Sequence, residues 1–149
     1  MTNPVTVEWK GAEQLINNLS TLSFETKDKL AFRAVAGAAR AVQRAAKNNI
    51  MSYDLVETGA LLDNVVTARQ KPEGLTFTYH VGVRHGTRSQ IKKGNDPWYW
   101  FILEFGSVKY EGRHFMTQAF ESEKQNALDL MRDSLDRGIQ TEVRRKAKQ

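Results

Sequence analysis

Four side chains of this sequence have the chemistry for acid–base catalysis or metal binding: His80, His85, His114 and Glu104. Imidazole and carboxylate groups are common general acids and bases, and both ligate metals. No serine or threonine near the histidines stands in a nucleophile-elbow motif, and no H-x-x-x-H spacing or acidic cluster joins the histidines. These residues therefore predict neither nucleophilic catalysis nor a metal site, and no cofactor is expected.

Glu104 is a lone acid within an aromatic segment, which is weak support for a general base. A small hydrolase that uses Glu104 and a histidine is the third of three functional hypotheses. A structural role is favoured, in which the carboxylate makes an ion pair or a helix-cap contact, with Arg113 or a neighbouring subunit as partner. No phosphate loop is indicated, because Gly82, Gly86 and Gly94 fit neither the dinucleotide nor the P-loop pattern.

The composition bounds the class of protein. The chain has 149 residues, which predicts a single domain over residues 1–149. It has no cysteine, which excludes disulfides, and no apolar run of membrane-spanning length. Residues 1–4 lack the features of a signal peptide, so none is expected. The net charge of +5 favours a polyanionic neighbour such as nucleic acid, but an ordinary basic soluble protein fits it equally well.

Residues 98–107 concentrate two Trp, one Tyr and two Phe around Glu104 and end at a glycine and a serine. Aromatic area of this size must be buried or meet a partner. Gly106 is expected to supply a special backbone angle or close packing. The candidate core and interface residues of this block and of the following helix start are Trp98, Trp100, Phe101, Leu103, Glu104, Phe105, Gly106, Phe115, Met116 and Phe120.

The elements that must position these side chains follow from periodicity and caps. Residues 5–9 alternate like a half-buried strand, and residues 12–22 are spaced like a short helix. A long helix is predicted from the N-cap Ser23 to about Ile50. Its apolar face contains Ala31, Val35, Ala38, Val42 and Ala45, and its opposite face carries basic residues.

The second half of the chain is predicted to hold a hairpin and a final helix. A capped turn at residues 58–62 leads into strand 64–70, and a turn at 71–74 leads into strand 75–84. Residues 86–96 are polar and basic, which predicts an exposed, mobile loop. The aromatic segment is predicted as a helical turn or a strand. The final helix starts near His114 or Phe115 and ends in a basic tail, residues 141–149, which is expected to fray.

The basic residues fall into three groups, on the long helix, in the loop and in the tail. They are Arg33, Arg40, Arg44, Lys47, Arg88, Lys92, Lys93, Arg144, Arg145, Lys146 and Lys148. Such a stripe is either a solvated face or a surface that meets DNA or an acidic partner. The sequence leaves both interpretations open.

Three blocks in a fixed order resemble a known family. They are Thr58-Gly59-Ala60-Leu61, the aromatic block Trp100 to Ser107 with its Leu-Glu-Phe-Gly-Ser, and Phe115-Met116-Thr117-Gln118-Ala119-Phe120. Together they are similar to the tail-completion (neck) proteins of long-tailed phages, of the Hong Kong 97 gene-product-ten-like type. Glu57 replaces a common Asp, while His114 and Gln118 stand where the family commonly has Pro.

The resemblance implies an α+β fold, with a small mixed or antiparallel sheet and hairpin packed by a long helix from the N-terminal half and a C-terminal helix. It implies a non-enzymatic virion protein that completes the tail and joins it to the head at the neck, after assembly in the host cytoplasm. The implied partners are itself, in a ring that is commonly sixfold, and tail terminator, tail tube, tape measure or head connector proteins, with DNA in the lumen and no membrane. The alternative is a basic nucleic-acid-binding protein without enzymatic activity.

Overall fold

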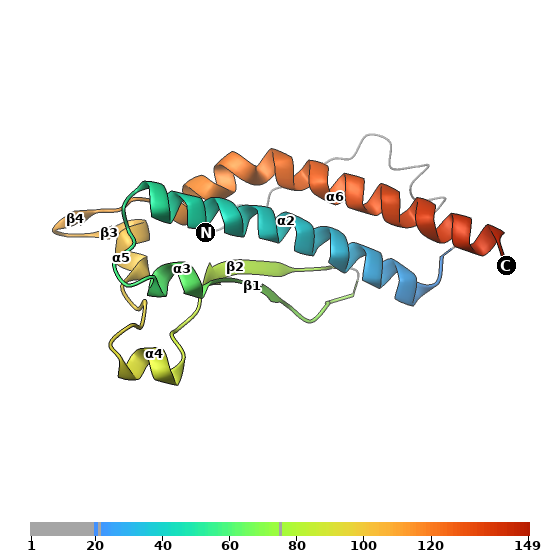
Figure 1. Cartoon of the computed structure of the whole chain (residues 1–149). Coiled ribbons are helices and arrows are strands. Elements are labelled where there is room, and N and C mark those ends of the chain that lie inside the picture. Colours follow the sequence, from blue (N-terminus) through green and yellow to red (C-terminus); the bar gives the residue numbers. More distant parts are fainter. Residues whose placement is uncertain (1–19, 21, 75) are drawn as a thin grey trace.

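The computed structural model describes residues 20, 22–74 and 76–149. The strand predicted at residues 5–9 and most of the helix predicted at 12–22 lie outside the described residues. Two long helices, α2 (Phe24–Ser52) and α6 (Phe115–Ala147), lie side by side, and a β-hairpin lies against α2 (Figure 1). Together they form the α+β fold that the sequence predicts.

Helix α2 begins where the sequence predicts. The Ser23 side chain accepts a hydrogen bond from the backbone N–H of Thr26, and Glu25 stands in the first turn. Small alanines fill most of the buried positions of α2, because α6 packs on one side and the hairpin on the other. Small side chains allow backbones to approach closely, so α2 is the central support of the molecule.

Helix α6 is longer than the apolar stripe that predicts it. Its last described turns include the predicted basic tail, since helix continues through Ala147. At this end Leu22, Leu30 and Ile139 form a small buried cluster. A Cβ added at Gly138 would lie 2.5 Å from a methyl carbon of Leu30, so the two helices are in close contact there.

The predicted hairpin is present, with shorter strands than expected. Strand β1 (Val65–Arg69) pairs antiparallel with β2 (Tyr79–Val83). The second strand was predicted over residues 75–84, and this was wrong at its start, because Glu73 and Thr76 bond to each other across the turn and separate it from the ladder. Helix α3 (Ala60–Asn64), rather than a turn alone, leads into β1.

The remaining elements connect the hairpin to α6. They are α4 (Arg88–Lys92), α5 (Trp100–Phe105), β3 (Gly106–Ser107) and β4 (Tyr110–Glu111). Of the two forms predicted for the aromatic segment, the helical one is present. The main core joins α2, α3, β1 and the start of α6, and consists of Ala46, Ile50, Leu61, Val65, Phe115 and Ala119.

Candidate interaction surface

Helix α5 has an unusual distribution of side chains. Trp100 and Leu103 pack against the main core, and Glu104 is only 1% exposed. By contrast Trp98, Phe101 and Phe105 are 58%, 47% and 68% exposed. These three, here called the aromatic stripe, follow each other at steps of three and four residues, which places Phe101 and Phe105 on one helical face. Trp98 lies just before α5, whereas Phe101 and Phe105 are on it. A buried acid with exposed aromatics on the same short helix is the reverse of ordinary folding and indicates a contact surface.

The buried carboxylate of Glu104 holds the start of α6. Its two oxygens accept hydrogen bonds from the backbone N–H groups of Met116 and Thr117, at 2.8 and 2.9 Å, and from the Thr117 hydroxyl at 2.5 Å. The first N–H groups of a helix lack partners within the helix, and a negative charge there also interacts favourably with the helix dipole. His114, the N-cap residue, makes no side-chain cap bond and has a φ of 50°. Of the roles predicted for Glu104, the structure shows the helix-cap contact.

Main-chain contacts join the same two helices. The N–H groups of Arg113 and His114 donate to the carbonyls of Leu103 and Glu104, at 2.6 and 3.1 Å. Helix α5 therefore accepts hydrogen bonds from N–H groups at the start of α6 and just before it, through its backbone carbonyls and its one buried side chain. Thr117 and Arg113 had no assigned role of this kind in the sequence, because a bond between two helices leaves no periodic pattern.

Two glycines permit this close approach. Gly106 has a φ of 83°, and a Cβ built on it would lie 2.7 Å from backbone atoms of Tyr110 and Gly112. A Cβ on Gly112 would lie 2.5 Å from the carbonyl oxygen of Glu104. Both contacts are with backbone, which cannot move aside easily. The special angle predicted for Gly106 is confirmed, whereas Gly112 was missed, since a lone glycine in a loop carries little signal.

The β3–β4 hairpin projects from the end of the molecule (Figure 1). Val108 at its turn is fully exposed, with a relative accessibility of 105%, and Tyr110 beside it is 39% exposed. An exposed apolar side chain at the tip of a projecting hairpin buries no apolar area within its own chain, so it does not stabilise the fold. This tip is therefore a second place where a partner could be contacted.

An apolar groove of about 750 Å³ lies between the two long helices, β2 and α5. Phe105 of the aromatic stripe and Phe120 of α6 are among its lining residues, and they are 68% and 44% exposed. The lining residues are Val35, Ala38, Ala39, Val42, Tyr79, His80, Val81, Gly82, Trp100, Glu104, Phe105, Met116, Thr117, Phe120, Lys124, Ala127, Leu128 and Met131. The groove and the aromatic stripe meet at Phe105, so apolar surface extends from α5 onto the helix pair.

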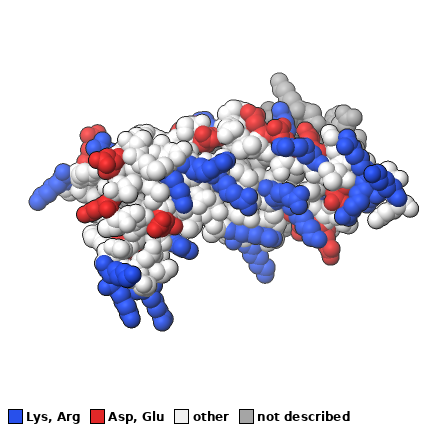
Figure 2. Space-filling model, viewed as in Figure 1, with Lys and Arg blue, Asp and Glu red and all other residues white. Residues whose placement is uncertain are grey.

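The basic residues give the molecule a cationic surface. Figure 2 shows Lys and Arg side chains over α2, over α4 and over the C-terminal part of α6. On α2, Arg33, Arg40 and Arg44 are exposed and Lys47 is half-buried, and none of them forms a salt bridge to a described acid. In the tail, Arg145 pairs with Glu142 at 3.1 Å. Within the described part of the chain, the cations on α2 thus have no acidic partner.

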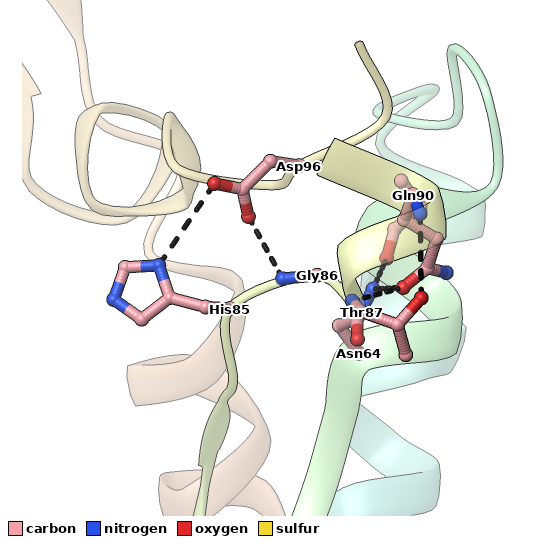
Figure 3. Close-up of polar contacts among 7 residues, drawn as sticks. Asn64, His85, Gly86, Thr87, Gln90 and Asp96 are labelled. Carbon is pink, nitrogen blue, oxygen red and sulfur yellow. Dashed lines mark hydrogen bonds and ion pairs between the residues drawn. The ribbon is translucent and has the colours of Figure 1, made fainter. Parts of the chain in front are cut away.

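Residues 86–96 form a polar connection around α4 (Figure 3). Thr87 and Gln90 cap the start of this helix reciprocally, with bonds of 3.3 and 2.8 Å. Asp96 closes the segment by accepting a bond of 2.8 Å from the N–H of Gly86, and it lies 3.9 Å from His85. None of the residues of α4 is buried, so Arg88, Lys92 and Lys93 project into solvent.

The geometry offers little to catalysis. Both oxygens of Glu104 are engaged by α6, and the histidines lie apart, on β2, at the edge of the polar connection and at the start of α6. Among the described residues, no three histidine, cysteine or acidic side chains converge where a metal ion could bind. None of the described helices combines the length and the apolar character needed to cross a membrane.

Comparison with known proteins gives one finding that bears on these surfaces. A family model described as "Bacteriophage HK97-gp10, putative tail-component" matches residues 13–106, which is more than half of the chain. The matched range includes α2, the hairpin and α5, and it ends at Gly106. No curated protein and no solved structure matches the chain.

Proposed function

Since the chain belongs to the HK97-gp10-like family of phage tail components, we propose that it completes the tail and joins it to the head at the neck. As a tail component it has a structural role in the virion and contacts other tail proteins. The finer assignment is that the whole chain, as a single domain, self-associates into a ring and docks onto neighbouring neck proteins. Under this proposal, assembly takes place in the host cytoplasm.

The exposed aromatic stripe is the observation that carries this proposal. A small chain gains stability by burying Trp and Phe, and yet Trp98, Phe101 and Phe105 remain 47% to 68% exposed in the isolated chain. Large aromatic residues are enriched at the centres of protein interfaces. The stripe, the groove that adjoins it and the projecting tip of Val108 provide different apolar surfaces on one molecule. Contacts between unlike surfaces close into rings when the rotation allows it.

The partners follow from this arrangement. One copy would contact the next through the stripe, and the remaining surfaces would meet the tail terminator, tail tube, tape measure or head connector. A sixfold ring is the expectation that comes from the family resemblance. The protein is not an enzyme under this proposal, because Glu104, the one buried acid among the described residues, serves the fold.

A second candidate function is supported by the cations of α2, which form no salt bridge with any acid that the structure describes. In a ring, the charges of Arg33, Arg40, Arg44 and Lys47 are repeated by each subunit, and together they would attract DNA or an acidic partner surface. The alternative, a nucleic-acid-binding protein without enzymatic activity, uses the same residues. In either case binding should weaken steeply with salt and show no sequence preference.

The experiment replaces exposed aromatics that the fold does not need. Phe101→Ser and Phe105→Ser should abolish self-association in sedimentation and head–tail joining in a reconstituted assembly, with the melting temperature little changed. Phe24→Ser is the matched control, because Phe24 is 63% exposed on α2, away from the stripe. If the stripe variants assemble and join as well as the control, the proposed interface is wrong.

Two further measurements separate the finer assignments. A label on the chain, seen by electron microscopy in virions, should lie at the head-proximal end of the tail, and a label elsewhere would contradict the neck position. Neutralising the α2 cations and the tail cations separately should reduce joining and its salt dependence if they meet DNA or an acidic surface. Unchanged joining in both would leave the cations as a solvated face.

A further inference from the structure

We propose that α4 of one copy docks onto a neighbouring copy of the chain, where a basic cluster meets an aromatic–acid cluster. The basic cluster consists of Arg88, Ile91, Lys92 and Lys93, and the aromatic–acid cluster consists of Glu57, Trp98 and Tyr99. The inference rests on the proposed self-association and deepens it, because it assigns residues to both sides of a contact between copies.

Opposite charges are separated along the chain before and after the β1–β2 hairpin. Residues 48–68 include Asp54, Glu57 and Asp63 and no lysine or arginine. Residues 84–95 include Arg84 and the three cations of the basic cluster and no acid. Figure 2 shows Lys and Arg side chains gathered over α4, at the lower end of the molecule. One chain therefore carries two surfaces of opposite charge, which attract each other between copies.

Hydrogen bonds fix α4 at both of its ends. Thr87 and Gln90 cap its start, and the N–H of Asn95 donates to the carbonyl of Gln90 at 2.8 Å beyond its end. The N–H of Gly86 donates to the Asp96 carboxylate, which closes the segment at its base (Figure 3). None of the three cations of the basic cluster forms a salt bridge with a described acid.

A buried amide anchors this segment to α3. The Asn64 side chain is fully buried, donates to the carbonyl of Ala60 at 2.7 Å and accepts from Nε of Arg84 at 3.0 Å. Its amide nitrogen also lies 3.5 Å from the side-chain oxygen of Gln90 on α4. The position of α4 relative to α3 is therefore fixed, and its cations could approach Glu57 of their own chain only by breaking these bonds. The acid that they meet is thus one of another copy.

The basic cluster has an apolar centre, which favours a protein partner over DNA. Ile91 is 50% exposed, with Arg88 three residues before it and Lys92 and Lys93 directly after it. Phosphate binding requires only the cations, and an exposed isoleucine adds nothing to such a contact. At a protein interface the isoleucine is buried at the centre, while the charged side chains form the rim.

The aromatic–acid cluster has the complementary chemistry. Trp98 is 58% exposed, and its ring lies 6.1 Å from that of Tyr99 at an angle of 83°. Burial, and after it the Glu57 carboxylate, raise the pKa of Tyr99, so this acid lies near the same pair of rings. Aromatic faces attract ammonium and guanidinium groups. Among the described residues the cation–π contact within the chain joins Arg69 to Phe32, which leaves the Trp98 ring without a cation.

The contact continues into the surface proposed for self-association, because Trp98 also belongs to the aromatic stripe. In the docked pair the cations of α4 would lie over the Trp98 ring and beside Glu57, and Ile91 would cover part of the same ring. The two clusters are unlike, so a copy that offers its basic cluster to one neighbour retains its aromatic–acid cluster for another. Contacts of this kind repeat around a ring when the rotation closes.

The test is charge reversal, measured by sedimentation of the full chain at low salt. Lys92→Glu and Glu57→Lys should each weaken self-association by about tenfold, because an attractive pair becomes repulsive. An equimolar mixture of the two variants should recover most of the wild-type association, since the reversed residue of one variant then meets that of the other. Both residues are exposed, so unchanged melting temperatures should show that the fold is intact.

Lys71→Glu and Glu73→Lys are the matched controls, since they make the same changes of charge at exposed residues of the β1–β2 turn. Each control should associate like the wild type. Association that survives Lys92→Glu or Glu57→Lys, or a mixture that associates no better than either variant alone, would overturn the contact. If Lys92→Glu removes binding to duplex DNA but leaves self-association at the wild-type level, the basic cluster meets DNA and the proposal is wrong.

The same measurements separate this contact from the proposed function. A wild-type chain that stays monomeric would overturn both the contact and the ring. Association that is lost in the Phe101→Ser and Phe105→Ser variants but unaffected by charge reversal would overturn the contact alone. Association that depends on Lys92 and Glu57, in a protein that is located away from the neck of the virion, would support the contact and refute the neck position.

Discussion

Glu104→Ala should destabilise the protein by removing the cap of α6. The wild-type carboxylate is buried and accepts three hydrogen bonds, two of them from backbone N–H groups of the first helical turn. Loss of a helix cap costs about 0.5–2 kcal/mol, and a buried donor left unsatisfied costs about 1–3 kcal/mol. Since water can reach part of Thr117, the lower values apply to that residue, and we expect a total of about 2–4 kcal/mol.

Glu104→Gln separates the contribution of the negative charge from that of the hydrogen bonds. The amide keeps one acceptor oxygen but presents an NH₂ group to a backbone donor, and it removes the negative charge at the helix start. We expect a loss of about 1–2 kcal/mol, between the wild type and the alanine variant. Urea denaturation followed by circular dichroism measures both. Glu111→Ala, an exposed acid on β4, should change stability by less than about 0.5 kcal/mol. If Glu104→Ala unfolds at the same urea concentration as Glu111→Ala, the carboxylate does not hold α6.

Three other changes test the same region. Gly112→Ala should lower the free energy of unfolding, measured by urea denaturation, by about 1–3 kcal/mol, because its Cβ would lie 2.5 Å from the carbonyl oxygen of Glu104. An unfolding free energy equal to that of the wild type would show that the backbone around Gly112 can shift without cost. Trp100→Ala should lower the melting temperature, whereas Phe105→Ala should barely change it and should instead weaken self-association; equal melting losses would contradict the division of α5 into two faces. Burial, and secondarily the Glu57 carboxylate, raise the pKa of Tyr99 above 10.0. The neutral phenol therefore stabilises the fold below pH 10, and this contribution is lost as the pH rises through the higher pKa of the folded state. Tyr99→Phe should flatten the decline of the unfolding free energy above pH 10, and an unchanged slope would refute this.

The long elements were predictable because their signals are local. Ser23 with Glu25, and the spacing of apolar residues after Phe115, define helices through bonds and faces within one segment. The hairpin followed from alternation around a turn. The start of β2 was placed too early because Thr76 pairs with Glu73 inside the turn, which propensity alone does not reveal.

For the candidate interaction surface, the sequence predicted which residues are present but not how they are arranged. The aromatic block marked α5, but the sequence could not say which rings face the core, because Trp100 and Phe101 are chemically similar neighbours. The bonds of Glu104 join α5 to a helix more than ten residues later, and the contact of Gly106 with Gly112 depends on how the intervening hairpin closes. Such features arise from packing between segments and leave no spacing rule in the chain.

The double attachment of α5 to α6 has a consequence for the kinetics of docking. Backbone bonds, a buried carboxylate and two glycines hold α5 in place, so the rings of Phe101 and Phe105 are carried on a support that is already ordered. Binding to such a rigid support loses little conformational entropy, and more of the contact energy is retained as affinity. Residence time at the interface proposed for these rings should then depend on residues outside it, since loosening Gly112 or Glu104 would shorten it while Phe101 and Phe105 stayed the same.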